Sequence, residues 1–326
     1  MKKVGRGVAC MWYGVWGEGG VAIVKVDIGG TVTLITGEVD IGQGLNTIMR
    51  QIVAEELGVR LETVRIISAS DSELTPNVGG AGGSRSTFMG GNAVRHAAAE
   101  VKRKVFEAAA DILHVNDEAL EARDGKIYVK GTPEKFVSFE DVTRGGVPII
   151  ATASSESKTT PMNTETGQGN PFQIFCYATQ IVDVEVDTET GMVKVLKIVA
   201  AHDIGKAINP AFVEGQIYGG IGFGVGQAIM ENMVTKDGKT LNPNLTDYLI
   251  PTSEDMPEVK PILIEENEPS GPFGGKMIGE PPNLPTAPAI INAIYNAVGV
   301  RIMDLPATPE KILKALKEKE TGSKNG

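Results

Sequence analysis

Cysteine is scarce in this 326-residue chain, which contains only Cys10 and Cys176, far apart in the sequence. Zinc sites and iron–sulfur clusters need closely spaced cysteines such as CxxC, so this chain by itself is expected to carry neither. Long apolar runs are also missing, since none approaches the roughly 20 residues that cross a bilayer. The opening stretch MKKVGRGVACMWYG lacks the apolar core and cleavage site of a signal peptide. The sequence therefore predicts a cytoplasmic protein without a membrane segment.

Positive charge is in deficit, because 31 Lys and Arg stand against 41 Asp and Glu and leave a net charge of −10. This argues against a nucleic-acid partner, because no stripe of basic residues is available to replace phosphate counterions. A phosphate-bearing cofactor stays open, because backbone N–H groups hold phosphate without cationic side chains. Glycine is in excess, with 40 residues gathered in clusters, which indicates tight turns and close approach of the backbone to a ligand.

Alternation and helical spacing predict the elements of the first half. Residues 21–28 and 32–39 are expected to be two strands joined by a hairpin turn. A helix is expected from Leu45, because apolar residues recur there at helical spacing, and Gly58 is its expected end. After a short strand and a glycine-rich stretch, a long helix is expected to end near His114.

A long loop is predicted at residues 152–172, which are rich in Ser, Thr, Gly and Asn. This Ser/Thr/Gly-rich loop would join two lobes, about 1–155 and 170–326. The second lobe opens with a hairpin that turns at residues 187–191 and continues with a helix that contains many glycines. Hairpins mixed with helices, without regular βαβ alternation, indicate the α+β class.

Two glycine clusters stand before predicted helices. Gly42, Gln43 and Gly44 offer successive N–H groups that form an anion-binding nest, and the Gln43 amide both donates and accepts. Taken alone, an ordinary turn fits this stretch better. The second cluster, GGAGGSRS at residues 79–86, is either a cradle for phosphate or a heterocycle, or a flexible loop. It is not a P-loop, because no Gly-Lys-Ser/Thr follows at the required spacing.

Three further features carry polar or aromatic side chains. Gln216 lies inside the second-lobe helix, where a cofactor edge and a neighbouring helix are equally good partners for its amide. Trp12 and Tyr13, with Trp16, form either part of the core or a wall of an aromatic substrate pocket. Glu280 precedes two prolines that fix its direction, and a pKa raised by burial would suit it to act as a general base or acid. On its own, this stretch fits a structural carboxylate near a helix start slightly better.

Five stretches, taken together and in this order, resemble the molybdenum hydroxylases, the family of xanthine dehydrogenase and aldehyde oxidoreductase. They are EVDIGQGLNTIMRQIVAEELGV, TPNVGGAGGSRSTFMGGNAV, HDIGKAINPAFVEGQIYGGIGFGVGQ, GEPPNLPTAPAIINAI and DLPATPEKI. The resemblance covers nearly the whole chain, but only the C-terminal half of the family's molybdenum-binding subunit. It implies the two-lobed α+β fold of the second molybdopterin-binding domain over residues 1–326. It further implies a naturally split subunit, most similar to the medium molybdopterin subunit of nicotinate dehydrogenase.

The resemblance also implies roles for the residues at matching positions. Glu280 matches the base that takes a proton from the attacking oxygen. Gly82 and Gly83 match positions beside the metal, where small residues leave room for substrate. Arg85 stands where a smaller residue is expected. No residue of the chain ligates molybdenum directly, because the pterin dithiolene does so in this family. The residues expected to bind the cofactor are Gly42, Gln43, Gly44, Gly82, Gly83, Ser84, Arg85, Ser86 and Gln216.

The activity that the resemblance implies is addition of a water-derived hydroxyl to an electron-poor carbon of an N-heteroaromatic, with nicotinate as the first choice. Oxidation of a purine or an aldehyde is the alternative. A protein of a different class, a non-catalytic molybdopterin carrier or assembly factor, would have no need of the base Glu280. The expected cofactor is molybdopterin with molybdenum, in a dinucleotide form. The expected partners are a larger molybdopterin subunit, an iron–sulfur subunit and an FAD subunit.

Overall fold

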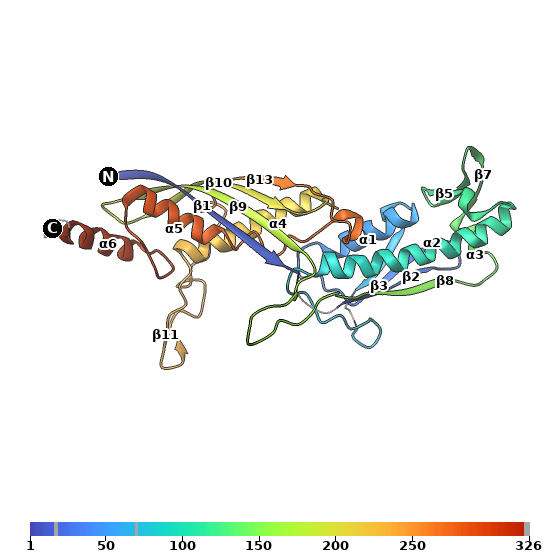
Figure 1. Cartoon of the computed structure of the whole chain (residues 1–326), viewed down its shortest axis with the longest axis horizontal. Helices are drawn as coiled ribbons and strands as arrows, with labels where there is room; N and C mark the ends of the chain where they lie inside the picture. The colour runs from blue at the N-terminus through green and yellow to red at the C-terminus, as the bar shows by residue number, and fades with distance from the viewer. Residues whose placement is uncertain (16–18, 69–70, 323–326) are drawn as a thin grey trace.

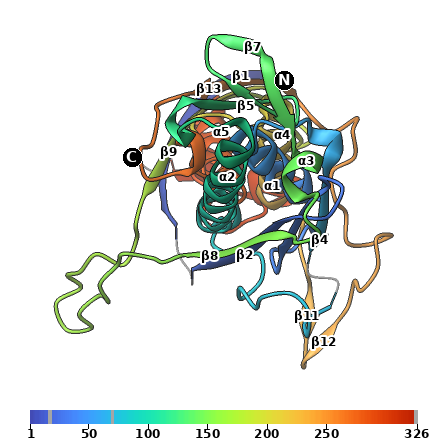
Figure 2. The same ribbon diagram turned by 90° about the vertical axis from the view of Figure 1, so that its right-hand side faces the viewer.

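The computed structural model describes residues 1–15, 19–68 and 71–322 and shows an elongated molecule built on two four-stranded sheets (Figure 1). One sheet covers its helices from above in the view of Figure 1, and the other covers its own helices from below. The end view in Figure 2 shows the same order, with the long helices between the two sheets. The helices therefore form a central layer that runs along the whole molecule.

The first lobe contains the sheet β4-β3-β2-β8 with helices α1 and α2 packed on one face. β2 and β3 form the predicted hairpin, with Val26 opposite Val32, and β4 runs parallel to β3. α1 ends at Gly58, which is left-handed, as the spacing predicts. The bounds are β2 (Gly20–Val26), β3 (Val32–Thr36), α1 (Leu45–Leu57), β4 (Val64–Ser68), α2 (Gly91–Leu113) and β8 (Ile149–Ser155).

The second lobe contains the sheet β1-β9-β10-β13, packed on helices α4 and α5. β9 and β10 form the predicted hairpin, and the Gly191 N–H donates to the Asp187 carbonyl in its turn. β13 runs parallel to β10. The bounds are β1 (Lys2–Gly14), β9 (Phe175–Asp187), β10 (Val193–Asp203), α4 (Pro210–Ile229), β13 (Glu258–Ile264), α5 (Thr286–Val298) and α6 (Pro309–Gly322).

Several smaller elements project from the two lobes. A three-stranded sheet and a short helix lie at the far end of the first lobe, and a small hairpin forms an arm below the second (Figure 1). The loop between β8 and β9 stands away from the body in Figure 2. The bounds are β5 (Leu120–Arg123), β6 (Lys126–Val129), β7 (Thr132–Ser138), α3 (Phe139–Thr143), β11 (Thr235–Lys236), β12 (Lys239–Thr240), and the short helices η1 (Leu61–Thr63), η2 (Ser86–Gly90), η3 (Asp117–Ala119) and η4 (Pro272–Gly274).

The two lobes repeat one topology. In each, an antiparallel hairpin is followed by a helix, a strand parallel to the second hairpin strand, and a second helix. The fourth strand, β8 in one sheet and β1 in the other, lies antiparallel to the first hairpin strand. The loop before α2 is therefore equivalent to the loop before α5. These two loops carry Ser84 and Glu280.

The strand β1 is the main element that the sequence pattern did not predict. It pairs with β9 over its full length, so residues 2–14 belong to the second sheet and not to the first lobe, where their position in the chain put them. Gly5 and Gly7 lower the apparent strand propensity of this stretch. They are needed because a Cβ at either position would overlap the backbone of α5, at Ala293 or Ala289. The division into lobes 1–155 and 170–326 otherwise stays a prediction.

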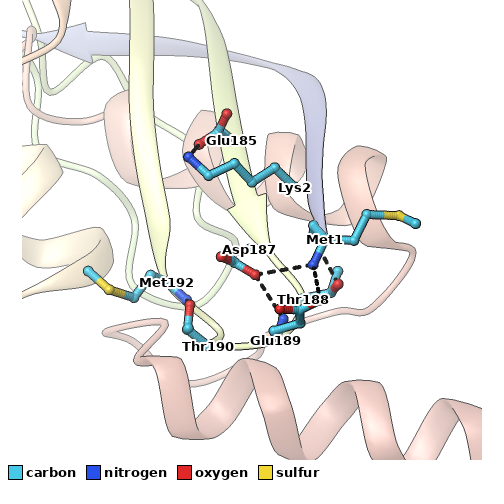
Figure 3. A network of polar contacts seen from close by, with 8 residues as sticks. All are labelled: Met1, Lys2, Glu185, Asp187, Thr188, Glu189, Thr190 and Met192. Atoms are coloured by element: carbon cyan, nitrogen blue, oxygen red, sulfur yellow. Dashed lines mark hydrogen bonds and ion pairs between the residues drawn. The ribbon is translucent and has the colours of Figure 1, made fainter.

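The start of β1 is fastened to the turn between β9 and β10 (Figure 3). The Met1 ammonium group lies 3.0 Å from a Glu189 carboxylate oxygen and 3.5 Å from Asp187. The Thr188 N–H donates to the Met1 carbonyl at 3.0 Å. These groups are largely exposed, so the backbone ladder and the packing of α5 dominate the attachment of β1.

Replacing Gly7 with alanine is expected to destabilise the full chain by about 1–3 kcal/mol, because the new methyl group must push α5 away from the sheet. Urea unfolding of purified protein measures the change. Gly145→Ala is the matched control: it adds the same methyl group in open space, with an ordinary φ, and is expected to stay within about 0.5 kcal/mol. Equal stability of the two variants would contradict the close packing of β1 on α5.

The α+β class is confirmed, but the predicted loop at residues 152–172 begins too early. Residues 152–155 continue β8 and pair with β2, and the loop starts at residue 156. Their Ser and Thr composition hid the strand, because this edge strand exposes alternate residues to solvent. Within the described residues, no helix combines the length and the apolar content needed to cross a membrane.

Candidate active site

Glu280 lies in the loop before α5 and meets the glycine-rich loop before α2. The Gly83 N–H donates to Glu280 Oε1 at 3.1 Å, and the Ser84 hydroxyl donates to Glu280 Oε2. In return, the Glu280 N–H donates to Ser84 Oγ at 2.9 Å. Glu280 is thus held by three hydrogen bonds, two to its carboxylate and one from its backbone N–H, to a segment almost 200 residues away. It remains exposed on its other side.

Two cavities meet at Glu280. The first, here called the GQG-side cavity, has a volume of about 270 Å³ and is lined by Ile41, Gln43, Ala81, Gly82, Ser84, Ser86, Thr87, Gln216, Gly279 and Glu280. The second, the Tyr13-side cavity, has a volume of about 460 Å³ and is lined by Tyr13, Gln216, Gly219, Gly220, Phe223, Gly279, Glu280, Asn283 and Leu284. Gln216, Gly279 and Glu280 line both. The fold therefore brings six of the expected site residues, from four separate stretches of chain, to one cavity.

The GQG turn does form an anion nest, but its anion is the carboxylate of Asp40. The N–H groups of Gly42, Gly44 and Asn46 donate to Asp40 at 2.9, 3.4 and 3.0 Å. Burial alone would raise the Asp40 pKa, but the N–H groups of Asn46, Gly42 and Gly44 together outweigh it and lower the pKa. While Asp40 stays there, these N–H groups are not available to a phosphate, contrary to the expected role of Gly42 and Gly44.

The Gln43 amide is mostly used to shape its own loop. Its Oε1 accepts from the Ile41 N–H at 2.6 Å, and its Nε2 donates to the Val39 carbonyl at 2.9 Å. One N–H and one lone pair are left to face the cavity. The turn also packs closely on α4, because a Cβ at Gly44 would lie 2.6 Å from the Phe212 ring.

Arg85 points into the protein and not into the cavity. It donates to the carbonyls of Val78 and Gly80, and its guanidinium lies 3.6 Å from the Glu38 carboxylate. Both side chains are almost fully buried. Burial raises the Glu38 pKa, and Arg85 and Ser86 act in the opposite direction. The Arg85 side chain therefore makes structural contacts in place of the expected contact with the cofactor. These contacts hold the glycine-rich loop on its buried side.

Gln216 lines both cavities, and its side-chain amide makes no hydrogen bond within the described part of the chain. Its helix presents open space nearby, because a Cβ at Gly215 or Gly219 would meet no atom within 4 Å. The amide is therefore free to bind a polar edge placed in either cavity.

Trp12 and Tyr13 point to opposite faces of β1. Tyr13 lines the Tyr13-side cavity. Burial raises the pKa of its hydroxyl most, and the Glu280 carboxylate raises this pKa further. Trp12 is 60% exposed on the other face and packs edge-on against Phe172 and Phe175. Only Tyr13 thus lies at the site. Trp16 lies outside the described residues.

Asp40 and Asp203 are structural residues that the sequence interpretation overlooked. Each begins an Asp-Ile-Gly stretch, Asp40 after β3 and Asp203 at the end of β10, and each accepts from the glycine N–H two residues on, at 2.9 and 3.3 Å. Asp203 also forms a largely buried ion pair with Lys276, at 2.8 Å, that links this turn to the Glu280 loop. The repeated letters DIG were the signal in the sequence that pointed to these residues.

Comparison with known proteins agrees with this architecture. The family described as "Molybdopterin cofactor-binding domain" matches residues 1–257. The xanthine dehydrogenase molybdenum-binding subunit of Escherichia coli O157:H7 is 37% identical, over 94% of this chain and 41% of that protein. The 6-hydroxypseudooxynicotine dehydrogenase complex subunit gamma of Paenarthrobacter nicotinovorans is 33% identical, over 95% and 39%.

The crystal structure of quinoline 2-oxidoreductase from Pseudomonas putida 86 superposes with a TM-score of 0.84 at 29% identity, over 97% of this chain and 42% of that one. The chain therefore spans about two fifths of the length of these relatives. The match over residues 1–257 confirms the family expected from the five sequence stretches. The chain belongs to the molybdopterin cofactor-binding domain family, in the form found in xanthine dehydrogenases and aldehyde oxidoreductases.

Proposed function

We propose that this chain is the catalytic part of a molybdenum-dependent hydroxylase that adds a water-derived hydroxyl group to an N-heteroaromatic, with nicotinate as substrate. The observation that carries the proposal is the Glu280 carboxylate, fixed by Gly83 and Ser84 on the wall between two cavities. A carrier or assembly protein would have no use for a carboxylate held in this way.

The polar groups and the open space of the GQG-side cavity support the proposal that it holds a molybdopterin cofactor. A Cβ at Gly82 would meet no protein atom within 4 Å, so the loop leaves room at this point. Gln43, Ser86 and Gln216 present polar groups to the cavity, as a pterin edge requires. The described residues contain no cluster of three or more His, Cys, Asp or Glu that could hold a metal ion. The cofactor would bring its own metal and supply the two-electron oxidation chemistry.

The chain's own contribution to the reaction is proton transfer and orientation. Glu280 accepts a proton on a carboxylate oxygen from the group that attacks the substrate. Gly83 and Ser84 orient the carboxylate, because both donate a hydrogen bond to it. Tyr13 faces the same carboxylate from the Tyr13-side cavity.

A planar aromatic substrate fits the Tyr13-side cavity, where Tyr13 and Phe223 supply aromatic surface and Gly219 of α4 leaves space. The names of the relatives support a heteroaromatic substrate, since two refer to quinoline and to a nicotine derivative. A purine or an aldehyde is the alternative, because another relative is a xanthine dehydrogenase subunit.

The remaining parts of the enzyme are proposed to lie on other chains. A larger molybdopterin subunit would supply the length that the relatives have beyond this chain. An iron–sulfur subunit and an FAD subunit would carry the electrons away, because Cys10 and Cys176 do not provide a cluster site. The dinucleotide form of the pterin and a cytoplasmic location belong to the same proposal.

Purification of the native complex through a tag on this chain tests the proposal. We expect co-purifying subunits, molybdenum by elemental analysis, and oxidation of nicotinate faster than of hypoxanthine or an aldehyde. If the complex oxidised hypoxanthine or the aldehyde faster than nicotinate, nicotinate would be wrong as the proposed substrate and the preferred compound would take its place. A purified complex that contains pterin but oxidises none of the three compounds would favour a non-catalytic carrier.

A further inference from the structure

We propose that Ser84 is a positioning residue that clamps the Glu280 carboxylate in its working orientation, an inference that rests on the role proposed above for Glu280. The resemblance to the family predicts a cofactor contact for Ser84. The hydrogen bonds assign it a different task.

The clamp is a two-way contact between one hydroxyl and one residue. The Ser84 hydroxyl donates to Glu280 Oε2, and its oxygen accepts from the Glu280 N–H at 2.9 Å. A serine hydroxyl has only one proton to donate, so Glu280 uses all of its donor capacity. Gly83 adds a backbone N–H to the other carboxylate oxygen at 3.1 Å. Side chain and backbone of Glu280 are thus fixed together.

The backbone of Ser84 is strained, and the strain indicates why a serine is present. Its φ of 51° lies in the left-handed region, which glycine adopts freely and other residues adopt at a cost. Four of the five preceding residues are glycines, and a fifth glycine at position 84 would relax the turn. What glycine lacks is the hydroxyl, and that hydroxyl is the group bound to Glu280.

The partner loop is also built to receive the hydroxyl. A Cβ at Gly279 would lie 3.0 Å from Ser84 Oγ, so the glycine beside Glu280 leaves the space that Ser84 enters. The contact joins the equivalent loops before α2 and α5, one from each lobe. Packing of the two lobes therefore sets the position of the base, and the Pro281–Pro282 pair limits its freedom from the other side.

The first test is a double-mutant cycle on the full chain, measured by urea unfolding. Ser84→Ala is expected to lower the folding equilibrium constant roughly tenfold with Glu280 present, but by a clearly smaller factor with Glu280→Gln, where the hydroxyl keeps the N–H of residue 280 and loses the carboxylate. Ser84→Gly, which removes the hydroxyl and the strain together, separates the lost contact from the backbone effect. Ser72→Ala, an exposed serine, is the control and should behave alike in both backgrounds.

The second test uses the assembled enzyme, because a purely structural serine would not alter proton transfer. Ser84→Ala, which loses the hydroxyl donor, is expected to shift the acidic limb of the kcat–pH profile to higher pH by roughly one unit. Its molybdenum content is expected to stay unchanged. Additive unfolding effects with an unchanged profile would overturn the clamp, even if Glu280→Gln is inactive. Strong coupling together with near-normal activity of Glu280→Gln would instead overturn the proposed role of Glu280.

Discussion

Glu280→Gln is expected to lower kcat of the assembled enzyme by about 10²–10⁴-fold while the molybdenum content stays that of the unmodified enzyme. Glutamine keeps the size of the side chain, and its amide oxygen still accepts from the Gly83 N–H, so the loop before α5 keeps its place. What the variant loses is an oxygen that takes up a proton. Steady-state kinetics at saturating substrate, with elemental analysis of the same sample, measures both parts of the result.

The matched control is Glu266→Gln, which makes the same change at an exposed residue on the segment that leads to the Glu280 loop. It is expected to leave kcat and molybdenum content unchanged. If Glu280→Gln retained activity within about threefold of the control, general base catalysis by this residue would be wrong, because such catalysis is worth far more than that. If instead the molybdenum content fell, Glu280 would serve the architecture of the cavity.

The composition of the site was predictable only from several stretches taken together. Gln43, Gly82, Ser84, Gln216 and Glu280 come from four separate segments, and each segment alone fits an ordinary turn or helix. Their order along the chain identified the family, and the fold brings them to one cavity. No local pattern contains that information, because the cavity depends on how the two lobes pack.

The interactions of individual groups were harder to predict. The nest at Gly42 and Gly44 was expected from glycine spacing, but its anion, Asp40, lies two residues before the first glycine in the same loop and was given no role. The strand β1 was missed for a related reason. Gly5 looks unfavourable for a strand until α5 is seen against it, and α5 lies almost 300 residues further along the chain.

Arg85→Met is expected to destabilise the full chain by about 3–5 kcal/mol, the largest stability change among the variants considered. Arg85 and Glu38 are 4% and 1% exposed at their side chains, so removal of the cation leaves a carboxylate buried without a counter-charge. The carbonyls of Val78 and Gly80 lose their donor at the same time. The glycine-rich loop is then no longer fixed from below, and we expect the cavity to lose affinity for its cofactor as well.

The pH dependence of this loss follows from the direction of the Glu38 pKa. Burial already raises that pKa in the native protein, although Arg85 opposes it. Without Arg85 the folded state holds the proton more firmly, while the unfolded state still releases it near pH 4.3. The stability that Arg85→Met gains from protonation of Glu38 is therefore complete below that pH. This contribution is lost as the pH rises through the higher pKa of Glu38 in the folded state. Urea unfolding at pH 5 and pH 8 should show the smaller loss at pH 5.

A second change separates the charge from the shape of the arginine. Arg85→Met combined with Glu38→Gln removes the uncompensated carboxylate and is expected to recover part of the stability, because replacement of a buried ion pair costs less than breaking it. Arg103→Met, at an exposed ion pair on α2, is the control and should cost less than about 1 kcal/mol. Equal losses for Arg85→Met and Arg103→Met would contradict the structural role of Arg85, since burial is what distinguishes the two arginines.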